Sequence, residues 1–197
     1  IPTPSGAVGT AIWLGNFTQT TAGSNTAHGG QVDALNLSAN SSTHRWQGYV
    51  GNVSGMIFLG KDLDVLFNFG VAEFDTVFAT TTSGVYFWGN LTAGEPVAVD
   101  NLWGFVNGND RAVKAFNSSA SFANLTSLVP VAEATGGFIT GIFNDGTNLS
   151  KDNHAFGAKI YTPAKAGLSG NDYQYELIVP TPTGGDETYY FYLRLAE

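Results

Sequence analysis

The chain has 197 residues, a formal net charge of −8 and an isoelectric point near 4.6, a balance that argues against binding to nucleic acid or to an anionic membrane surface. Cysteine is absent, which excludes disulfides and thiolate metal sites. Only 12% of the residues are charged, so Ser, Thr, Asn and Gly must supply most of the polar surface. No apolar run approaches the roughly 20 residues that span a bilayer, so we expect no membrane insertion.

The N-terminus has the layout of an assembly strand. Residues 1–4 begin without Met, as expected of a mature product whose leader has been removed, and their two prolines disfavour a central strand. An apolar stretch follows, and alternate positions share one face of the predicted strand: Val8, Thr10, Ile12 and Leu14. Such a strand either completes its own sheet or leaves to complete that of a neighbour by donor-strand β-augmentation.

Beyond this strand the pattern is β almost throughout, and the 25 glycines punctuate it at a spacing typical of sandwiches and barrels. The predicted strands are 7–19, 30–38, 45–60, 62–70, 73–80, 84–90, 96–106, 136–143, 154–161, 172–180 and 187–195. A short helix is predicted at 110–116, with weaker helical signals at 119–128. The expected fold is an all-β sandwich of jelly-roll or immunoglobulin-like style. We divide the chain into a donor-strand segment, 1–14, and a single sandwich domain, 15–197.

The last two predicted strands are interpreted as a hairpin. Residues 173–179 lead through a Pro- and Gly-rich turn into residues 188–195. Alternation divides the returning strand into two faces, Tyr190, Tyr192 and Arg194 on one, and Tyr189, Phe191, Leu193 and Leu195 on the other. The second face is expected in the core, and the first is either a packed aromatic ladder or an exposed surface.

Half of the 16 asparagines begin an Asn-x-Ser/Thr triplet, where roughly 2.7 such triplets are expected by chance. The eight are Asn16, Asn36, Asn40, Asn52, Asn90, Asn117, Asn124 and Asn148. The triplet (sequon) is the acceptor signal for N-glycosylation of exported proteins, although an Asn- and Thr-rich β protein also produces it by composition alone. We expect an extracellular or cell-surface protein that carries N-linked glycans at these positions.

Patterns that carry catalysis are absent from the sequence. There is no Gly-x-Ser-x-Gly elbow and no phosphate-binding loop, and the histidines His28, His44 and His154 are scattered. Several acidic residues are candidates for a glycosidase pair but are more typical of solvated strand ends: Asp62, Asp64, Glu73, Asp75 and Glu95. The sequence therefore predicts no enzyme, no catalytic residue and no cofactor.

One loop concentrates the oxygen ligands that Ca²⁺ prefers: Asn144, Asp145, Asn148, Asp152 and Asn153. Their spacing does not match an EF-hand, and a glycan on Asn148 would occupy the same space. The pattern favours a polar turn over a metal site.

The stretch 46–55, WQGYVGNVSG, together with Tyr189-Tyr190-Phe191-Tyr192 and the many sequons, resembles archaeal secreted, N-glycosylated, β-rich surface proteins. Some members of this type form bundling pili or thread-like fibres in which an N-terminal strand is donated to the next subunit. The resemblance implies a structural subunit of an extracellular filament, with residues 1–14 as donor, the chain itself as partner and other surface glycoproteins as further partners. It implies no catalytic residue, and the N-terminal hydrophobic helix of type IV pilins is missing.

Two other interpretations stay open. A secreted carbohydrate-binding or adhesive module would present flat aromatic faces to sugar rings, and its candidates are Trp13, Trp46, Trp88 and Trp103, although such residues more often fill cores. A secreted hydrolase on a jelly-roll fold is supported by fold class alone, which does not determine function.

Overall fold

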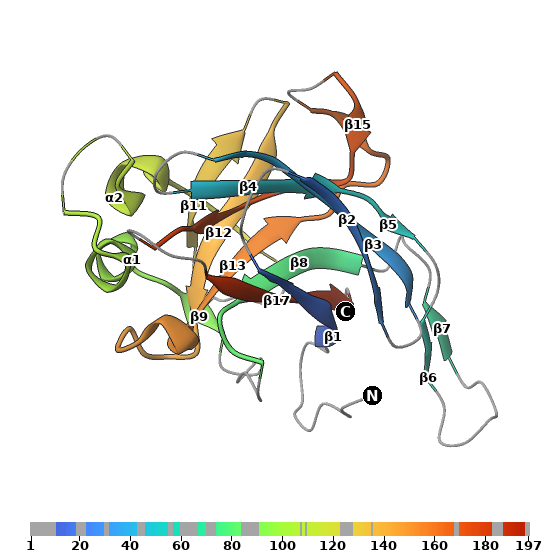
Figure 1. The fold of residues 1–197 in the computed structure, drawn as a ribbon, viewed down its shortest axis with the longest axis horizontal. Helices are drawn as coiled ribbons and strands as arrows, with labels where there is room; N and C mark the ends of the chain where they lie inside the picture. The colour runs from blue at the N-terminus through green and yellow to red at the C-terminus, as the bar shows by residue number, and fades with distance from the viewer. Residues whose placement is uncertain are drawn as a thin grey trace.

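The computed structural model describes residues 11–18, 23–29, 32–42, 46–54, 57–59, 67–69, 74–83, 91–106, 108, 110–122, 128–134, 136–167, 170–182 and 187–195. For residues 11–42 and 54–69 it describes the course of the backbone alone. Antiparallel strands dominate, which confirms the predicted all-β class (Figure 1). None of the helices in the described ranges is long and apolar enough to cross a membrane.

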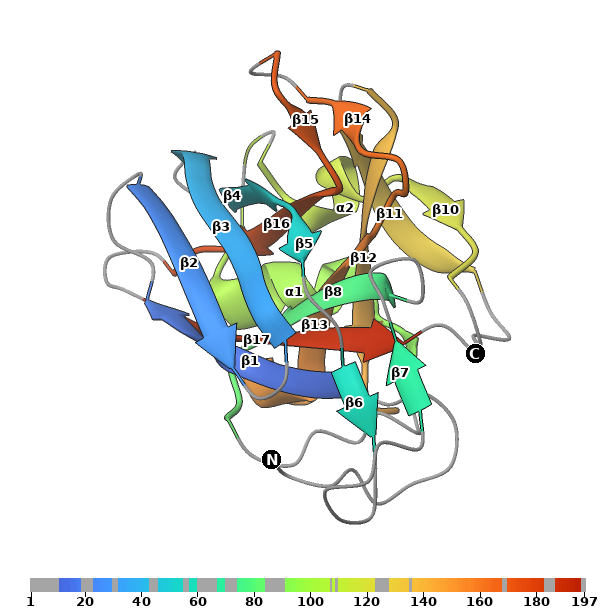
Figure 2. The same cartoon turned by 90° about the vertical axis from the view of Figure 1, so that its right-hand side faces the viewer.

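The longer sheet has eight strands within the described ranges. Its main path runs, in spatial order, through β1 (Ala11–Thr18), β17 (Thr188–Leu195), β8 (Phe74–Thr80), β13 (His154–Lys159), β12 (Phe138–Asn144), β11 (Val129–Ala134) and β10 (Ser118–Ala120). The two-residue strand β9 (Thr92–Ala93) pairs with β12. The strands β1 and β10 are thus the two edges of this sheet, and they lie apart in Figure 2.

The second sheet runs through β16 (Tyr175–Pro180), β4 (Trp46–Gly51), β3 (Val32–Ser42) and β2 (Gly23–Gly29), and β5 (Val53–Ser54) pairs with β3. Two small ribbons extend from the body: β6 (Ile57–Leu59) with β7 (Phe67–Phe69), and β14 (Lys165–Ala166) with β15 (Asp172–Tyr173). Helices α1 (Pro96–Trp103) and α2 (Ala112–Ala115) lie together at one end of the sheets, and a 3₁₀ turn, η3 (Lys151–Asn153), precedes β13.

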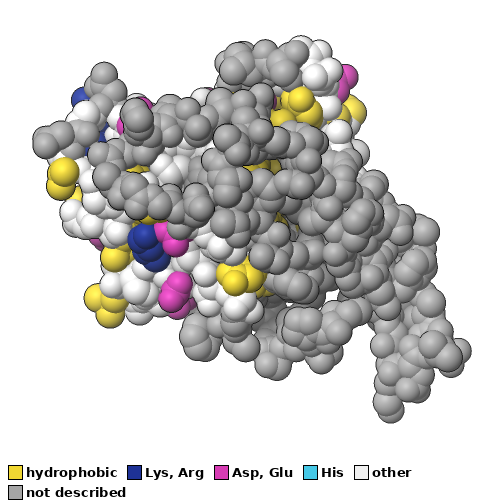
Figure 3. All heavy atoms as spheres, in the orientation of Figure 1, with side chains coloured by type: hydrophobic (Ala, Val, Ile, Leu, Met, Phe, Trp, Pro, Cys, Tyr) yellow, Lys and Arg dark blue, Asp and Glu magenta, His cyan; other side chains and the backbone are white. Residues whose placement is uncertain are grey.

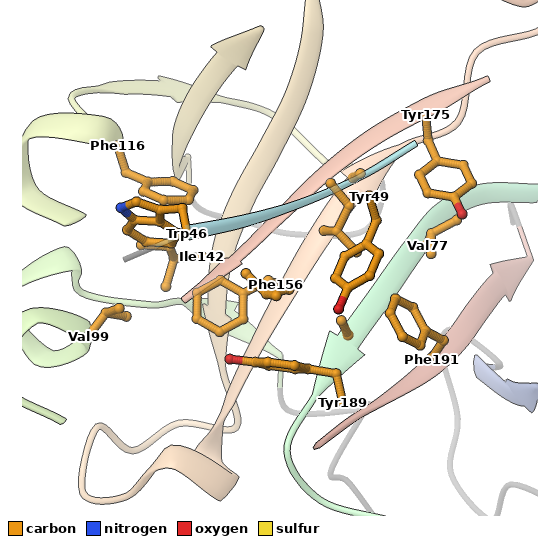
Figure 4. Close-up of a cluster of buried hydrophobic side chains, with 14 of the residues drawn as sticks. Trp46, Tyr49, Val77, Val99, Phe116, Ile142, Phe156, Tyr175, Tyr189 and Phe191 are labelled. Carbon is orange, nitrogen blue, oxygen red and sulfur yellow. The ribbon is translucent and has the colours of Figure 1, made fainter. Parts of the chain in front are cut away.

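The two sheets share one aromatic core (Figure 4). Tyr49 of β4 packs edge-on against Phe191 of β17, with ring centroids 5.4 Å apart. Toward the helices, the ring of Trp46 lies 5.5 Å from that of Phe105 and 5.3 Å from that of Phe116. Burial of such large side chains contributes about 1.5–3 kcal/mol each, so this core is the main link between the sheets.

The opposite face of the longer sheet carries a smaller cluster. Phe78 of β8 and Tyr192 of β17 belong to it, whereas their neighbours along each strand point into the main core. Rings meet edge to face here too, Phe143 against Phe78 and against Phe122. Both faces of the longer sheet are therefore covered with packed aromatic side chains.

The prediction of a strand at 96–106 is wrong, because α1 occupies most of it. Pro96 lies in the first helical turn, where its missing N–H is not needed. Gly104 ends the helix in the left-handed region at φ 73°, and its N–H donates to the carbonyl of Asp100. The valines suggested a strand, but the buried side chains recur at helical spacing: Val99, Asp100 and Trp103.

The prediction of a C-terminal hairpin is also wrong. Residues 175–180 form β16, which pairs with β4, whereas residues 188–195 form β17, which pairs with β8 and β1 in the other sheet. The connection therefore crosses between sheets, and the hydroxyl of Tyr189 donates to the carbonyl of Pro180 at 2.6 Å across it. The predicted core face of β17 is confirmed for Tyr189, Phe191 and Leu193, which are fully buried, whereas the side chain of Leu195 lies outside the described residues.

Other boundaries agree in part with the prediction. The helix predicted at 110–116 is confirmed as the shorter α2, and the weak helical signal at 119–128 is wrong at its start, where β10 is a strand. The predicted strand 45–60 is divided into β4, β5 and β6, and β2 and β11 were not predicted. The predicted strand 84–90 lies outside the described residues.

Candidate assembly edge and glycosylation sites

The N-terminal strand β1 lies at an edge of the longer sheet and has one hydrogen-bonded neighbour among the described strands, β17. The pairing runs antiparallel from Ala11 opposite Arg194 to Thr18 opposite Thr188. The register shifts between Trp13 and Gly15, so Leu14 lies at a bulge, which is a common feature of edge strands. In this structure β1 completes the sheet of its own chain.

The structure describes the backbone of two of the four residues predicted to form the assembly face. Ile12 lies in β1 opposite Leu193, and Leu14 lies at the bulge without a partner on β17. Val8 and Thr10 lie outside the described residues. The pairing continues beyond Leu14 to Thr18, so the strand extends four residues past the predicted donor segment, 1–14.

The strand that pairs with β1, β17, is anchored to β8 on its other side by an ion pair. Arg194 of β17 makes a bidentate ion pair with Asp75, with Nε to Oδ1 at 2.9 Å and the terminal nitrogen to Oδ2 at 3.0 Å. The same guanidinium lies 5.5 Å from the ring of Phe78, and the Arg194 side chain is only 6% exposed. This ion pair links the neighbouring strands β17 and β8. It was not predicted from the sequence, because the two residues are 119 positions apart.

The sequons occupy different environments in the structure. By backbone position, Asn16 lies in β1, Asn36 and Asn40 lie in β3, and Asn52 lies between β4 and β5. Asn52 is half-buried, and its Oδ1 accepts the N–H of Gln174 at 3.0 Å. Two further sequon asparagines, Asn90 and Asn124, lie outside the described residues.

Among the sequon asparagines whose side chains the structure describes, which are Asn52, Asn117 and Asn148, Asn117 is the exposed one. It follows α2 and directly precedes β10, and both serines of its triplet, Ser118 and Ser119, are exposed as well. Exposure of the whole triplet leaves room around the amide nitrogen for a bulky sugar.

Asn148 is half-buried and has a structural role through its amide oxygen. Its Oδ1 accepts from Nδ2 of Asn144 at 2.7 Å, and from the backbone N–H of Glu95 at 3.5 Å. Oδ1 of the buried Asn144 in turn accepts from the hydroxyl of Thr92 and from the N–H of Gly146. N-glycosylation modifies Nδ2 and leaves Oδ1 unchanged, so this network is compatible with a glycan on Asn148.

The oxygens of the loop that was considered for Ca²⁺ accept hydrogen bonds from the protein. Oδ1 of Asp145 accepts from the backbone and the hydroxyl of Thr147, and its Oδ2 accepts from Asn153. Asp152 accepts from the hydroxyl of Thr81 at 2.9 Å. The described ranges contain no group of three or more His, Asp or Glu residues placed to hold a metal ion.

His154 is the histidine whose side chain the structure describes, and it is fully buried. Its Nδ1 lies 2.9 Å from the carbonyl oxygen of Ser150, which can only accept, so Nδ1 carries the proton. Burial lowers the pKa of His154, and the Ser150 carbonyl and the charge of Asp145 oppose this shift only in part. Its ring meets that of Trp103 edge to face at 6.1 Å, which indicates a core role.

The acidic candidates do not converge where they are described. Asp75 is paired with Arg194, and Glu95 is an exposed residue that precedes α1. Asp62, Asp64 and Glu73 lie outside the described residues.

Two of the four tryptophans are core residues, Trp46 at 7% exposure and Trp103 at 3%. The side chains of Trp13 and Trp88 lie outside the described residues, so a sugar-binding surface would depend on those two.

Sequence reasoning missed one buried carboxylate that organises the helical end. Asp100 of α1 accepts from the N–H of Ala112 at 2.6 Å and from Nε of Arg111 at 3.2 Å, and it thereby caps α2. Burial of a carboxylate is tolerated when hydrogen bonds and a cation compensate its lost hydration. A lone acidic residue within the apolar run 96–103 was the signal that could have identified it.

Comparison with known proteins gives no match. No family model, curated protein or solved structure is similar to this chain at a significant level.

Proposed function

We propose that this chain is the repeating structural subunit of an extracellular, N-glycosylated filament in which each sandwich domain is completed by the N-terminal strand of a neighbour. The observation that carries the proposal is the position of β1. It is an edge strand that contains the last four residues of the N-terminal apolar stretch, 11–14, and its partner β17 is packed in the core and paired with β8 on the other side.

Exchange of β1 between subunits conserves the pairing energy. The register from Ala11 opposite Arg194 to Thr18 opposite Thr188 can form equally within one chain or between two. Removal of β1 exposes unpaired backbone on β17, and a neighbour's strand satisfies those groups again. Because the donated strand and the groove are different surfaces, the contact is heterologous and builds an open polymer.

Chain connectivity also favours exchange. Only residues 19–22 separate β1 from β2, which belongs to the other sheet. Short hinges between elements favour domain swapping, because an extended hinge that reaches a neighbour relieves the tight connection.

Surface composition supports an exported location. Charged side chains are sparse on the described part of the face in Figure 3, and uncharged side chains predominate. Such a surface depends on neutral polar groups and glycans for its hydration, which agrees with eight sequons in 197 residues.

An engineered disulfide distinguishes the two positions of β1. Thr18 and Thr188 are opposite each other in the register, within the Cα separations that disulfides tolerate. The chain has no other cysteine, so Thr18→Cys combined with Thr188→Cys gives one defined cross-link. We expect oxidised filaments to run as a covalent ladder on non-reducing denaturing gels, because each cross-link joins two subunits.

The matched control is Thr18→Cys alone, which loses the Asn16 sequon in the same way but forms no such link. A monomer band from oxidised double-cysteine filaments would place β1 in its own chain and contradict strand donation. Absence of filaments from the wild-type chain under electron microscopy would contradict the polymer itself.

A further inference from the structure

The edge opposite β1 is closed by a very short strand. β10 spans three residues, Ser118–Ala120, and its neighbour is β11, with Ser118 opposite Val131 and Ala120 opposite Val129. A terminal antiparallel strand leaves outward N–H and C=O groups that can pair with a foreign strand. Three residues correspond to about 10 Å of such an edge.

Within the described residues of β10, no charged side chain protects this edge. Natural edges are often guarded by charged residues, and β10 contains only Ser118, Ser119 and Ala120. Leu128, the residue before β11, is 61% exposed and lies one position beyond the pair Ala120 and Val129. An apolar side chain beside unpaired backbone favours association with another strand.

We propose that Asn117 carries an N-linked glycan that covers the β10 edge and prevents lateral association of subunits. Asn117 is exposed and directly precedes β10, so its sugar would leave the chain at the start of the strand that is terminal among the described strands of this sheet. The inference rests on the export assumed in the proposed function and deepens it. A filament in which donated strands pair only with β17 requires that the other edge of the longer sheet, β10, does not pair with further strands.

The modification replaces one N–H bond of the Asn117 amide by a bond from Nδ2 to the anomeric carbon of the sugar. The donor is a glycosyl diphosphate, whose bond between the anomeric carbon and oxygen breaks. The diphosphate leaves with the electron pair, and the amide proton passes to a base of the cell's glycosyltransferase.

The test uses the full chain made in glycosylating cells. Mass spectrometry of the peptide that contains Asn117 is expected to show the added sugar. Asn117→Gln and Ser119→Ala both remove the sequon, whereas Ser119→Thr retains it. We expect the first two variants to form filament bundles and to raise light scattering several-fold, and the third to behave as wild type.

Two results would overturn the proposal: an Asn117 peptide without sugar, or a glycosylated wild type whose two sequon-free variants remain dispersed. If the chain forms no filaments, size-exclusion chromatography reads the same lateral association between single subunits. The two proposals are therefore tested by separate measurements. The cysteine cross-link tests strand donation, and mass spectrometry of the Asn117 peptide tests whether a glycan covers the β10 edge.

Discussion

The two edges of the longer sheet differ in length and chemistry. β1 has eight residues, begins with an apolar stretch and pairs along its length with β17. β10 has three residues, and the first two are exposed serines that belong to the Asn117 sequon. A long strand such as β1 can form many backbone hydrogen bonds when it pairs with the sheet of another subunit, whereas a short strand such as β10 can form few.

This difference suggests how one sheet can polymerise in a single direction. Association is favoured where an incoming strand buries apolar side chains and satisfies backbone groups together, and the β17 side offers both. At β10 a covering glycan would remove access to the same backbone groups. In the proposed filament, directional growth would depend on keeping the two edges unequal.

The largest effect is expected from removing the long edge. Deletion of residues 1–18 removes all of β1 and should abolish filaments and expose β17, whereas deletion of residues 1–6 should leave filaments intact, because the apolar stretch remains. Electron microscopy of both variants under identical conditions is the measurement. Normal filaments from the longer deletion would show that β1 takes no part in assembly.

A large effect on stability is expected at the anchor of β17. Arg194→Ala leaves Asp75 partly buried without its cation, and breaking such a pair should lower the free energy of unfolding by about 3 kcal/mol. Arg194→Lys keeps the charge but loses the bidentate geometry, so it should recover about half of the loss. Urea unfolding followed by tryptophan fluorescence measures both, and equal stability of the wild type and Arg194→Ala would contradict a structural role for the pair.

A smaller effect is expected at the turn between β12 and β13. Asn148→Ala leaves Nδ2 of the buried Asn144 without its acceptor and should cost about 1–3 kcal/mol. Asn148→Asp also destroys the sequon but retains an oxygen that can accept from Asn144, so it should cost less than about 1 kcal/mol. Thermal unfolding of the two variants separates the hydrogen-bonding role of Asn148 from that of any glycan at this position, and equal losses would contradict the structural role.

The smallest effect is a pH dependence in the middle of the sheet, away from both edges. Burial lowers the pKa of His154 in the folded state, so the folded chain binds fewer protons than the unfolded chain as the pH falls below about 6.5. Stability should therefore be full above that pH and fall by at most about 1.4 kcal/mol per pH unit below it. Unfolding measured between pH 7 and 5.5 should show this slope, and His154→Gln should flatten it; an unchanged slope in the variant would assign it to other groups.

The strands and their buried faces could be predicted where local alternation determined them. The alternation in β17 places Tyr189, Phe191 and Leu193 in the core, as expected. The hairpin prediction failed because pairing partners depend on distant segments, and Pro180 and Pro182 looked like a tight turn although the chain crosses between sheets there. The strand predicted at 96–106 failed because its valines favour strands, while its proline and glycine stand where helix ends need them.

The sequence predicted where the candidate site residues are in the chain, but it did not predict their exposure or their hydrogen bonds. The sequence identified every sequon, but only the fold distinguishes the exposed Asn117 from Asn148, whose amide oxygen accepts from Asn144. The oxygen-rich loop looked like a set of ligands because proximity in sequence does not show which oxygens already accept hydrogen bonds.

By itself, the sequence determined the all-β class, the low charge, the absence of cysteine and the acceptor triplets, because composition and local alternation are properties of short segments. Only the tertiary structure decided that the C-terminal strand lies between β1 and β8, and that β10 is the opposite edge. It also paired Arg194 with Asp75 and buried Asp100 under α2. The strand order and the ion pair join segments far apart in the chain, and the burial and pairing that hold them exist only once the two sheets have packed together.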